Sequence, residues 1–292
     1  MSKRIETKVS VTAQKTCLIR AISYYEQDKH YQSNDFIAPK IISSWINWSA
    51  KYNLSRTLLK KHFFKRLGMY EYLIARTKFI DDIFDNLPAN IEQVLIFGAG
   101  FDSRAIRFSS KLQNAQVFEL DAPVTQQAKI RKLRERNVEL PANLKFIAID
   151  FTKEALQQKL AIAGFQKKRP CLFLLEGLTY YLNEDAIDST FKLISDYAGK
   201  ESLIVFDYAS AAALRKGNTY EDPRMKKFYQ SLVKAGEKPG FAVQEDIQDF
   251  LTKYDFALIT EFDSAKLAEE FFNQQELGPI VKTLRIVKAV KR

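Results

Sequence analysis

Two glycines and one acidic residue have the types and spacing expected of a ligand site. An apolar run at residues 94–97, typical of a strand buried on both faces, leads directly into Gly98 and Gly100. Glycine lets the chain turn sharply and lets a ligand approach the main chain closely. A second apolar segment, 116–120, ends on Asp121, 23 residues after Gly98. Since an acid about 20 residues beyond such a turn binds ribose hydroxyls in nucleotide-binding βαβ units, the spacing predicts a nucleoside-type ligand.

The dinucleotide-binding pattern of three glycines is incomplete in this loop. Its third glycine position is Ser103, which counts against a dinucleotide and leaves an adenosine ligand open. Asp102 and Ser103 instead suit the cap of a following helix. A nicotinamide-dependent oxidoreductase, a non-catalytic nucleotide-binding protein, and a tight turn with no ligand remain alternatives on these residues alone.

Acidic residues also follow the next three apolar strands. Segments 144–149, 170–175 and 202–206 end on Asp150, Glu176 and Asp207. Ligands of open α/β sheets bind beyond the carboxyl ends of the strands. We therefore expect Asp150 and Glu176 to contact the ligand, with Asp207 as a weaker candidate.

Strands and helices alternate five times from residue 94 onward, which indicates a doubly wound, mostly parallel sheet. Two further strands at 256–262 and 283–290 suggest an antiparallel pair at the sheet edge, giving a seven-stranded, Rossmann-like α/β fold. Helical spacing also predicts these helices: 16–25, 35–49, 67–84, 124–137, 153–163, 186–197, 223–235, 244–254 and 264–274.

The chain is expected to form one domain over residues 1–292. Its parts are a helical N-terminal segment or lid (1–90), a nucleotide-binding core (91–207), an insertion (208–242), and a C-terminal helix with edge strands (243–292). A chain of 292 residues with 46% hydrophobic content can bury one large core.

The composition of the chain limits its expected binding partners and its expected cellular compartment. The net charge is +10, but the basic residues are spread and form no recognised nucleic-acid module, which disfavours nucleic acid as a partner. No leader peptide and no apolar run long enough for a membrane span occur, so no membrane partner is expected. Cys17 and Cys171 form neither a disulfide framework nor a zinc site. A cytoplasmic protein without a bound metal is expected, and its oligomeric state stays open.

Several short motifs follow one another over about residues 11–182. They are Val11-Thr12-Ala13, Ile19-Arg20-Ala21, Ala75-Arg76-Thr77 with Asp81, Gly98-Ala99-Gly100-Phe101-Asp102-Ser103-Arg104, Phe118-Glu119-Leu120-Asp121-Ala122-Pro123, Asp150-Phe151, and Glu176-Gly177-Leu178-Thr179-Tyr180-Tyr181-Leu182. Taken in order, these motifs resemble the leucine carboxyl methyltransferase family, in particular its bacterial S-adenosylmethionine-dependent O-methyltransferases. Residue 151 is Phe where the family usually has Leu.

The resemblance implies a class I methyltransferase fold and S-adenosylmethionine as cofactor. It implies that Arg76 pairs with the methionine carboxylate, a task suited to guanidinium, that Glu176 faces the methionine amino group, and that Asp121 binds the ribose. The remaining implied contacts are Arg20 as an added cation, Gly98, Ala99 and Gly100 along the methionine, and Asp150 and Phe151 at the adenine.

The methyl acceptor is expected to be a small molecule or a carboxylate-bearing group. A carboxylate needs no general base, whereas a hydroxyl usually does, and histidine is the commonest. His30 and His62 are the two histidines and both precede the sheet. Tyr181 is the candidate for orienting the acceptor, with simple packing on the cofactor loop as the alternative. Arg104 and Arg107 are expected to brace the glycine loop, and residues 208–242 to influence the choice of acceptor.

Overall fold

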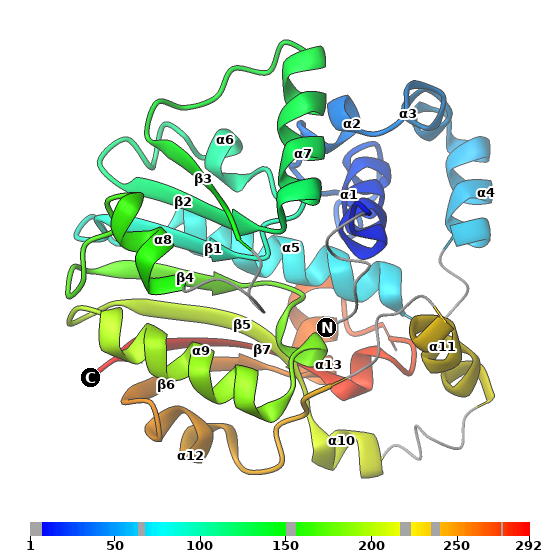
Figure 1. The fold of residues 1–292 in the computed structure, drawn as a ribbon. Helices are drawn as coiled ribbons and strands as arrows, with labels where there is room; N and C mark the ends of the chain where they lie inside the picture. Colours follow the sequence, from blue (N-terminus) through cyan, green and yellow to red (C-terminus); the bar gives the residue numbers. More distant parts are fainter. Residues whose placement is uncertain (1–7, 64–67, 150–155, 217–222, 235–239, 276) are drawn as a thin grey trace.

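A seven-stranded sheet with helices on both sides forms the centre of the molecule (Figure 1). The computed structural model describes residues 8–63, 68–149, 156–216, 223–234, 240–275 and 277–292. In chain order the strands are β1 (Gln93–Phe97), β2 (Gln116–Asp121), β3 (Leu144–Ala148), β4 (Cys171–Leu175), β5 (Leu203–Ala209), β6 (Phe256–Phe262) and β7 (Leu284–Lys291).

The strand order is β3-β2-β1-β4-β5-β7-β6. Strands β1 to β5 are parallel, and the order reverses between β1 and β4, where doubly wound sheets bind their ligands. The expected antiparallel pair at the edge is confirmed. The reversed strand is β7, which is antiparallel to both β5 and the edge strand β6.

Helices cover the sheet and extend over its carboxyl edge. They are α1 (Val11–Tyr24), α2 (Ala38–Ile41), α3 (Ser44–Lys51), α4 (Asn53–Phe63), α5 (Met69–Asp85), α6 (Arg104–Arg107), α7 (Pro123–Glu135), α8 (Leu156–Ile162), α9 (Glu184–Tyr197), α10 (Ala211–Lys216), α11 (Pro223–Lys234), α12 (Ile247–Thr252) and α13 (Ser264–Phe271). Two 3-10 turns, η1 (Thr179–Tyr181) and η2 (Val281–Thr283), complete the described elements.

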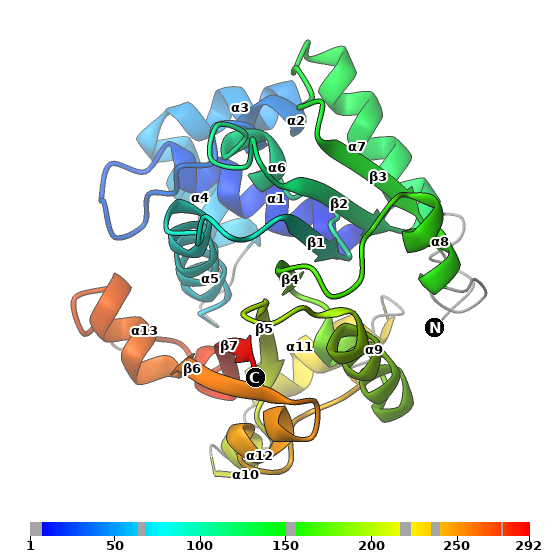
Figure 2. The ribbon, with the colours of Figure 1, turned by 90° about the vertical axis from the view of Figure 1, so that its left-hand side faces the viewer.

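Side chains of the central strands alternate between two apolar cores. In β1, Val94 and Ile96 join the core beneath α1 and α5, while Leu95 and Phe97 join the core beneath α8 and α9. Figure 2 shows these helix pairs on opposite sides of the sheet. Because both faces are covered, β1 and β4 are buried along their whole length, and their carboxyl ends are fixed in place.

The predicted helix over 35–49 is wrong as one continuous helix. The chain is extended at Ile42, with ψ 174°, so α2 ends at Ile41 and α3 begins at Ser44. Ile41 and Ile42 are both buried, and the break turns this adjacent pair into the core. The first residues of the predicted 153–163 helix lie outside the described residues. Helix α8 ends at Ile162, and Gly164, which is expected to close the helix, has a φ of +84°.

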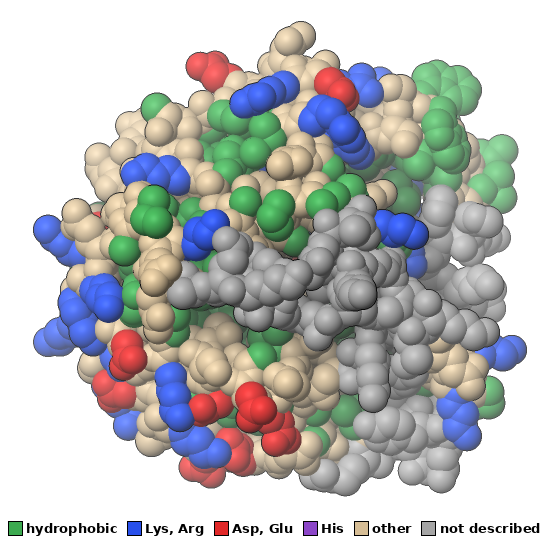
Figure 3. Space-filling view, in the orientation of Figure 1, with side chains coloured by type: hydrophobic (Ala, Val, Ile, Leu, Met, Phe, Trp, Pro, Cys, Tyr) green, Lys and Arg blue, Asp and Glu red, His purple; other side chains and the backbone are tan. Residues whose placement is uncertain are grey.

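On the face drawn in Figure 3, surface charge is dispersed, as the sequence indicates. Figure 3 shows Lys and Arg side chains scattered over one face rather than gathered in one block. Among the described helices, none is both long and apolar enough to cross a membrane.

Candidate functional site

The glycine loop after β1 turns back onto the end of β2. Gly98 and Gly100 have φ +60° and +50°, a region that glycine adopts at little cost. The Ala99 N–H donates to the Leu120 carbonyl at 2.9 Å. A Cβ on Gly100 would lie 2.9 Å from the Cβ of Ala13 in α1, so the loop and the N-terminal helix approach each other too closely for a side chain.

Asp121 closes this loop from the end of β2. Its Oδ2 accepts the Gly100 N–H and its Oδ1 accepts the Ala122 N–H at 2.6 Å. Burial raises the pKa of Asp121, and these backbone donors oppose the rise. Each carboxylate oxygen keeps lone-pair capacity beyond its backbone donor, so Asp121 can still accept hydroxyl groups of a ligand.

Glu176, just beyond β4, joins two arginines from different elements. Its Oε2 accepts from Arg104 Nη1 at 2.5 Å, and its Oε1 lies 3.0 Å from Arg76 Nη2. Burial alone would raise the pKa of Glu176, but Arg104 and Arg76 lower it. Glu176 is therefore held as a carboxylate between the glycine loop and helix α5.

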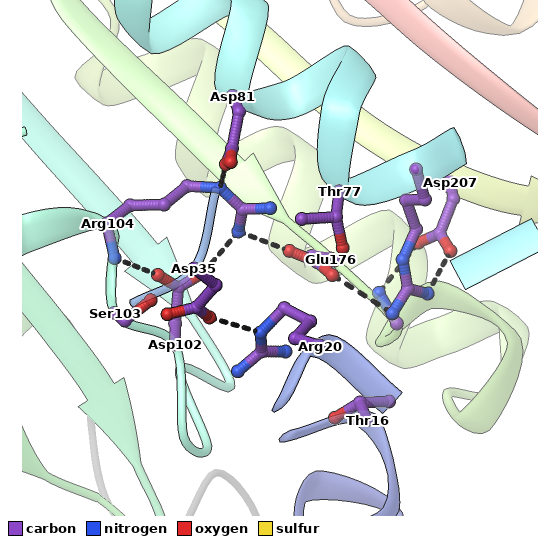
Figure 4. Close-up of polar contacts among 12 residues, drawn as sticks. Thr16, Arg20, Asp35, Thr77, Asp81, Asp102, Ser103, Arg104, Glu176 and Asp207 are labelled. Carbon is purple, nitrogen blue, oxygen red and sulfur yellow. Dashed lines mark hydrogen bonds and ion pairs between the residues drawn. The ribbon is translucent and has the colours of Figure 1, made fainter. Parts of the chain in front are cut away.

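Arg104, the first residue of α6, braces the glycine loop as predicted. Besides Glu176 it binds Asp81 of α5 through Nε at 2.8 Å, and it pairs through Nη1 with Asp102 (Figure 4). The Asp102 Oδ1 also accepts the Arg104 N–H at 2.6 Å, whereas Ser103 makes no side-chain cap. Burial opposes ionisation, but Arg104 and Lys129 lower the pKa of Asp102 to about 2.

Both terminal nitrogens of Arg76 contact acids. Nη1 donates to Asp207 Oδ2 at 2.6 Å and to the Tyr180 hydroxyl at 3.0 Å, while Nη2 faces Glu176. Among the described residues its buried Nε has no hydrogen-bond partner. The side chain is 2% exposed, so an incoming carboxylate would meet Nε or compete with these acids.

Asp207 organises the surroundings of Arg76 rather than opening into a pocket. Its carboxylate is 1% exposed. It accepts from the Tyr72 hydroxyl at 2.9 Å, the Tyr180 hydroxyl at 3.1 Å and the Gly177 N–H at 2.7 Å. These contacts therefore favour a structural role for Asp207 over the weaker prediction that it is an acid of the ligand pocket.

Arg20 lies at the other end of this polar network. Its Nε donates to Asp35 at 2.8 Å and its Nη2 to the Phe101 carbonyl in the glycine loop at 2.6 Å. Arg107 links Asp35 to Asp81, with N–O distances of 3.6 and 2.7 Å. Arg20 thus contacts the loop backbone, in the same network as Glu176 but without touching it.

Tyr181 lies on η1, beside Tyr180, with ring centroids 5.0 Å apart. Of the two, Tyr180 is the tyrosine bound to Arg76 and Asp207. The strand-like segment from Gly240 runs along this turn, because the Gly240 N–H donates to the Tyr180 carbonyl at 2.8 Å. A Cβ on Gly240 would lie 2.2 Å from the Leu182 carbonyl oxygen, so glycine permits this contact.

Sequence reasoning located part of this network and missed part of it. Gly98, Ala99, Gly100, Asp121, Glu176, Arg76 and Arg20 all lie along it, and Asp150 and Phe151 lie outside the described residues. The missed members are Tyr72, Tyr180, Asp35 and Asp102 as acid and hydroxyl partners of the arginines. A buried arginine requires acceptors, and that rule could have directed the search to them.

Several features suit S-adenosylmethionine. Asp121 retains acceptor capacity, a Cβ on Gly98 would meet nothing closer than Leu178 at 3.5 Å, and the buried Arg76 Nε is an unpartnered cationic donor. These fit a ribose, a close chain approach and an anionic group, respectively. No group of three His, Cys, Asp or Glu side chains suited to a metal occurs among the described residues.

Comparison with known proteins matches the family model "Leucine carboxyl methyltransferase" to residues 13–195. YktD of Bacillus subtilis, which carries the name of an S-adenosyl-L-methionine-dependent methyltransferase, is 29% identical over 223 residues, 75% of this chain and 72% of that protein. A Mycobacterium marinum protein with the same type of name is 37% identical over 143 residues, which is 49% of this chain and 45% of its own length.

Solved structures agree on the fold. A methyltransferase-like protein of Thermobifida fusca has a TM-score of 0.58 at 15% identity and covers 95% of this chain and 94% of its own. A DUF574 family protein of Streptomyces avermitilis has a TM-score of 0.58 at 10% identity, covering 99% and 100%. The family model extends over more than half of the sequence, on the segment that carries the glycine loop, Asp121 and Glu176. The chain therefore belongs to the leucine carboxyl methyltransferase family and is an S-adenosylmethionine-dependent methyltransferase.

Proposed function

We propose that this methyltransferase acts on an oxygen atom, a carboxylate or an acidic hydroxyl, of a small or carboxylate-bearing acceptor. Gly98, Asp121 and Glu176 lie at the carboxyl ends of the adjacent strands β1, β2 and β4, where the cofactor would bind, and the resemblance of the sequence motifs to O-methyltransferases carries the choice of oxygen. Because the chain belongs to this family, methyl transfer takes the place of the two alternatives, a nicotinamide-dependent oxidoreductase and a non-catalytic binding protein.

The cofactor contacts are proposed residue by residue. Asp121 holds the ribose hydroxyls and Glu176 faces the amino group. Arg76 faces the carboxylate, which its Nε can bind because this atom has no hydrogen-bond partner among the described residues. The lesser contacts are Gly98, Ala99 and Gly100 along the chain, Arg20 through the loop it supports, and Asp150 with Phe151 at the adenine. The bound cofactor supplies an electrophilic methyl group, so the protein's own work is to orient the acceptor oxygen and exclude water.

A carboxylate acceptor is favoured by the surroundings of the site. His30 is exposed and its ring Nδ1 lies 2.9 Å from the Phe271 carbonyl, so it is engaged away from the glycine loop. The side chain of His62 lies outside the described residues. Acceptors that need no base therefore suit these residues best.

Residues 208–242 are proposed to set the choice of acceptor together with Tyr181. Gly240 and Phe241 form backbone hydrogen bonds with Tyr180 and Leu182 at 2.8 Å each, so the end of the insertion forms a wall beside η1. Tyr181 lies on this turn, and we assign it the role of orienting the acceptor. Cys17 and Cys171 are buried free thiols, which supports a reducing, cytoplasmic compartment.

The test is transfer of a tritiated methyl group from S-adenosylmethionine into size-separated cell extract. A carboxyl methyl ester releases volatile methanol in mild alkali, whereas a methyl ether does not. We expect labelled product in the small-molecule fraction, with alkali-labile label pointing to a carboxylate. Label found only on nitrogen or carbon would overturn oxygen transfer. Asp121→Asn should lose the transfer, and Glu92→Gln, at an exposed glutamate paired with Arg169, should keep it.

A further inference from the structure

Helices α3 and α4 carry a set of exposed apolar side chains, called here the α3–α4 patch. Trp45 and Trp48 are each 62% exposed, Tyr52 54%, Leu54 78% and Leu58 59%. Figure 3 shows apolar side chains gathered at the upper right, over these two helices. Large contiguous apolar patches mark interaction sites more often than chance exposure does.

The spacing places these side chains on two adjoining stripes. Trp45 and Trp48 are three residues apart, and Leu54 and Leu58 four, so each pair lies on one side of its helix. The Trp48 and Tyr52 rings touch, with centroids 5.1 Å apart, and α3 packs against α4. The two stripes therefore present one amphipathic surface.

The sequence around the patch is basic and free of acids. Residues 36–70 contain no Asp or Glu, and they contain Lys40, Lys51, Arg56, Lys60, Lys61, Lys65 and Arg66. Arg56 and Lys60 bind Glu26, whereas Lys40 and Lys51 are exposed. Positive charge beside exposed tryptophan and leucine is the pattern of surfaces that lie in an anionic lipid interface.

Helix α7 extends the positive border. Arg136 at its end donates to the Ser44 hydroxyl at 2.7 Å, which joins α7 to the start of α3. Arg134 is exposed nearby. The negative charge of Glu135 is offset by Arg131, whose Nε lies 3.8 Å from Glu135 Oε1. The neighbourhood of the α3–α4 patch is thus predominantly cationic.

We propose that the α3–α4 patch docks on the surface of an anionic lipid bilayer. The proposal is independent of the acceptor, and it departs from the expectation, drawn from the sequence, of no membrane partner. Tryptophan places an apolar ring and a polar N–H at the headgroup level. Leu54 and Leu58 can enter the acyl boundary, while Lys51 remains among the headgroups.

Other occupants suit the patch less well. A two-fold contact between copies would set the same basic residues against each other with no acid between them. Lysine is depleted at protein–protein interfaces, although tryptophan and tyrosine are enriched there. Trp45, Trp48 and Tyr52 offer stacking faces to single-stranded nucleic acid, whereas Leu54 and Leu58 offer none. Both occupants are outcomes of the test below.

The experiment uses the chain's own fluorescence, because its two tryptophans, Trp45 and Trp48, are both in the patch. The full chain is titrated with phosphatidylcholine vesicles, with and without phosphatidylglycerol, while sedimentation measures the bound fraction. We expect a blue shift of emission and at least tenfold stronger binding to the anionic vesicles, weakened by salt.

Variants decide whether the patch is responsible. Leu54→Ser with Leu58→Ser, and separately Lys51→Gln, should each reduce vesicle binding several-fold without changing the far-ultraviolet circular dichroism. Ile162→Ser, at an equally apolar side chain 85% exposed on α8, is the matched control and should bind as the wild type does. Absence of vesicle binding would overturn the proposal. So would a blue shift produced by protein concentration alone, or by an oligonucleotide but not by vesicles.

Discussion

The chemistry of the site depends on buried arginines that are held by acids before any ligand binds. Arg76 is bound by Asp207 and Glu176, and Arg104 by Glu176, Asp102 and Asp81. A buried charge is costly unless it is paired. The alternation of acids and bases therefore fixes the directions in which the two guanidinium groups point (Figure 4).

Asp207→Asn is predicted to weaken cofactor binding although Asp207 is expected to touch no ligand. The substitution removes the charge that holds Arg76 Nη1 at 2.6 Å, and breaking a buried pair costs about 3 kcal/mol of stability. Calorimetric titration with S-adenosylhomocysteine should show an affinity lower by about tenfold, which is about 1.4 kcal/mol.

Two further variants separate positioning from simple destabilisation. Tyr180→Phe removes one hydroxyl from both Arg76 and Asp207 and should lower affinity with a smaller loss of stability. Asp255→Asn is the control. Asp255 pairs with Lys291, the last residue of β7, and its substitution should leave the affinity for S-adenosylhomocysteine unchanged. If Asp207→Asn lowers the thermal midpoint but leaves affinity intact, Asp207 has only a structural role.

Glu119 predicts a pH dependence of stability. It is 1% exposed, pairs with Lys129 at 2.5 Å, and its Oε1 has no hydrogen-bond partner among the described residues. Burial raises the pKa of Glu119 from 4.5 to about 7, against the effect of Lys129. Because the folded pKa is the higher one, its contribution is fully present below pH 4.5 and is lost as the pH rises through about 7.

Replacing Glu119 by Gln removes that titration. The free energy of unfolding of Glu119→Gln minus that of the wild type is predicted to increase by about 1 kcal/mol or more between about pH 5 and pH 8, because only the wild type loses stability as Glu119 ionises. Urea unfolding at several pH values measures this difference. Glu92→Gln, at an exposed glutamate, should show no such trend, and a pH-independent difference for Glu119→Gln would contradict the assignment.

At the scale of elements, the sequence predicted the sheet better than the site. Continuous apolar runs predicted β1 and β4 because both strands are buried on both faces, and Gly98 and Asp121 marked where two strands end. The break at Ile42 was missed, since helical spacing does not report an extended residue turned toward the core. Contacts such as Tyr72 with Asp207, 135 residues apart, follow from tertiary packing and leave no local pattern.

The approach of α1 to the glycine loop gives a prediction about two elements. Gly98→Ala and Gly100→Ala both place alanine at positive φ, which costs about 1–3 kcal/mol. The Gly100 variant alone also brings a Cβ to 2.9 Å from Ala13. We expect Gly100→Ala to be the more destabilising in thermal unfolding without cofactor.

A rescue experiment tests whether that contact is the cause. Ala13→Gly removes the opposing Cβ, at a helix cost of about 1 kcal/mol. If α1 packs on the loop as described, the double variant Ala13→Gly, Gly100→Ala should be more stable than the sum of the single effects predicts. Strict additivity would mean that Ala13 does not meet the loop.

At the scale of the whole molecule, the helices before β1 are tied to the sheet by buried polar contacts and not by packing alone. Arg20 binds the Phe101 carbonyl at 2.6 Å, and Tyr72 and Arg76 bind Asp207 in β5. One apolar core also contains side chains of α1, α5 and the central strands together. These links support the prediction that the described N-terminal helices and the sheet form a single domain.

The chain is therefore predicted to unfold in one cooperative step. Breaking the N-terminal helices away would remove Tyr72 and Arg76 from Asp207 and Arg20 from the Phe101 carbonyl, which costs too much for a separate transition. Far- and near-ultraviolet circular dichroism should report the same thermal midpoint. Because S-adenosylhomocysteine would bind only the folded chain, a concentration 100 times its dissociation constant should stabilise that single transition by about 2.7 kcal/mol. An early transition that the ligand leaves unshifted would instead mark the N-terminal helices as an independent lid.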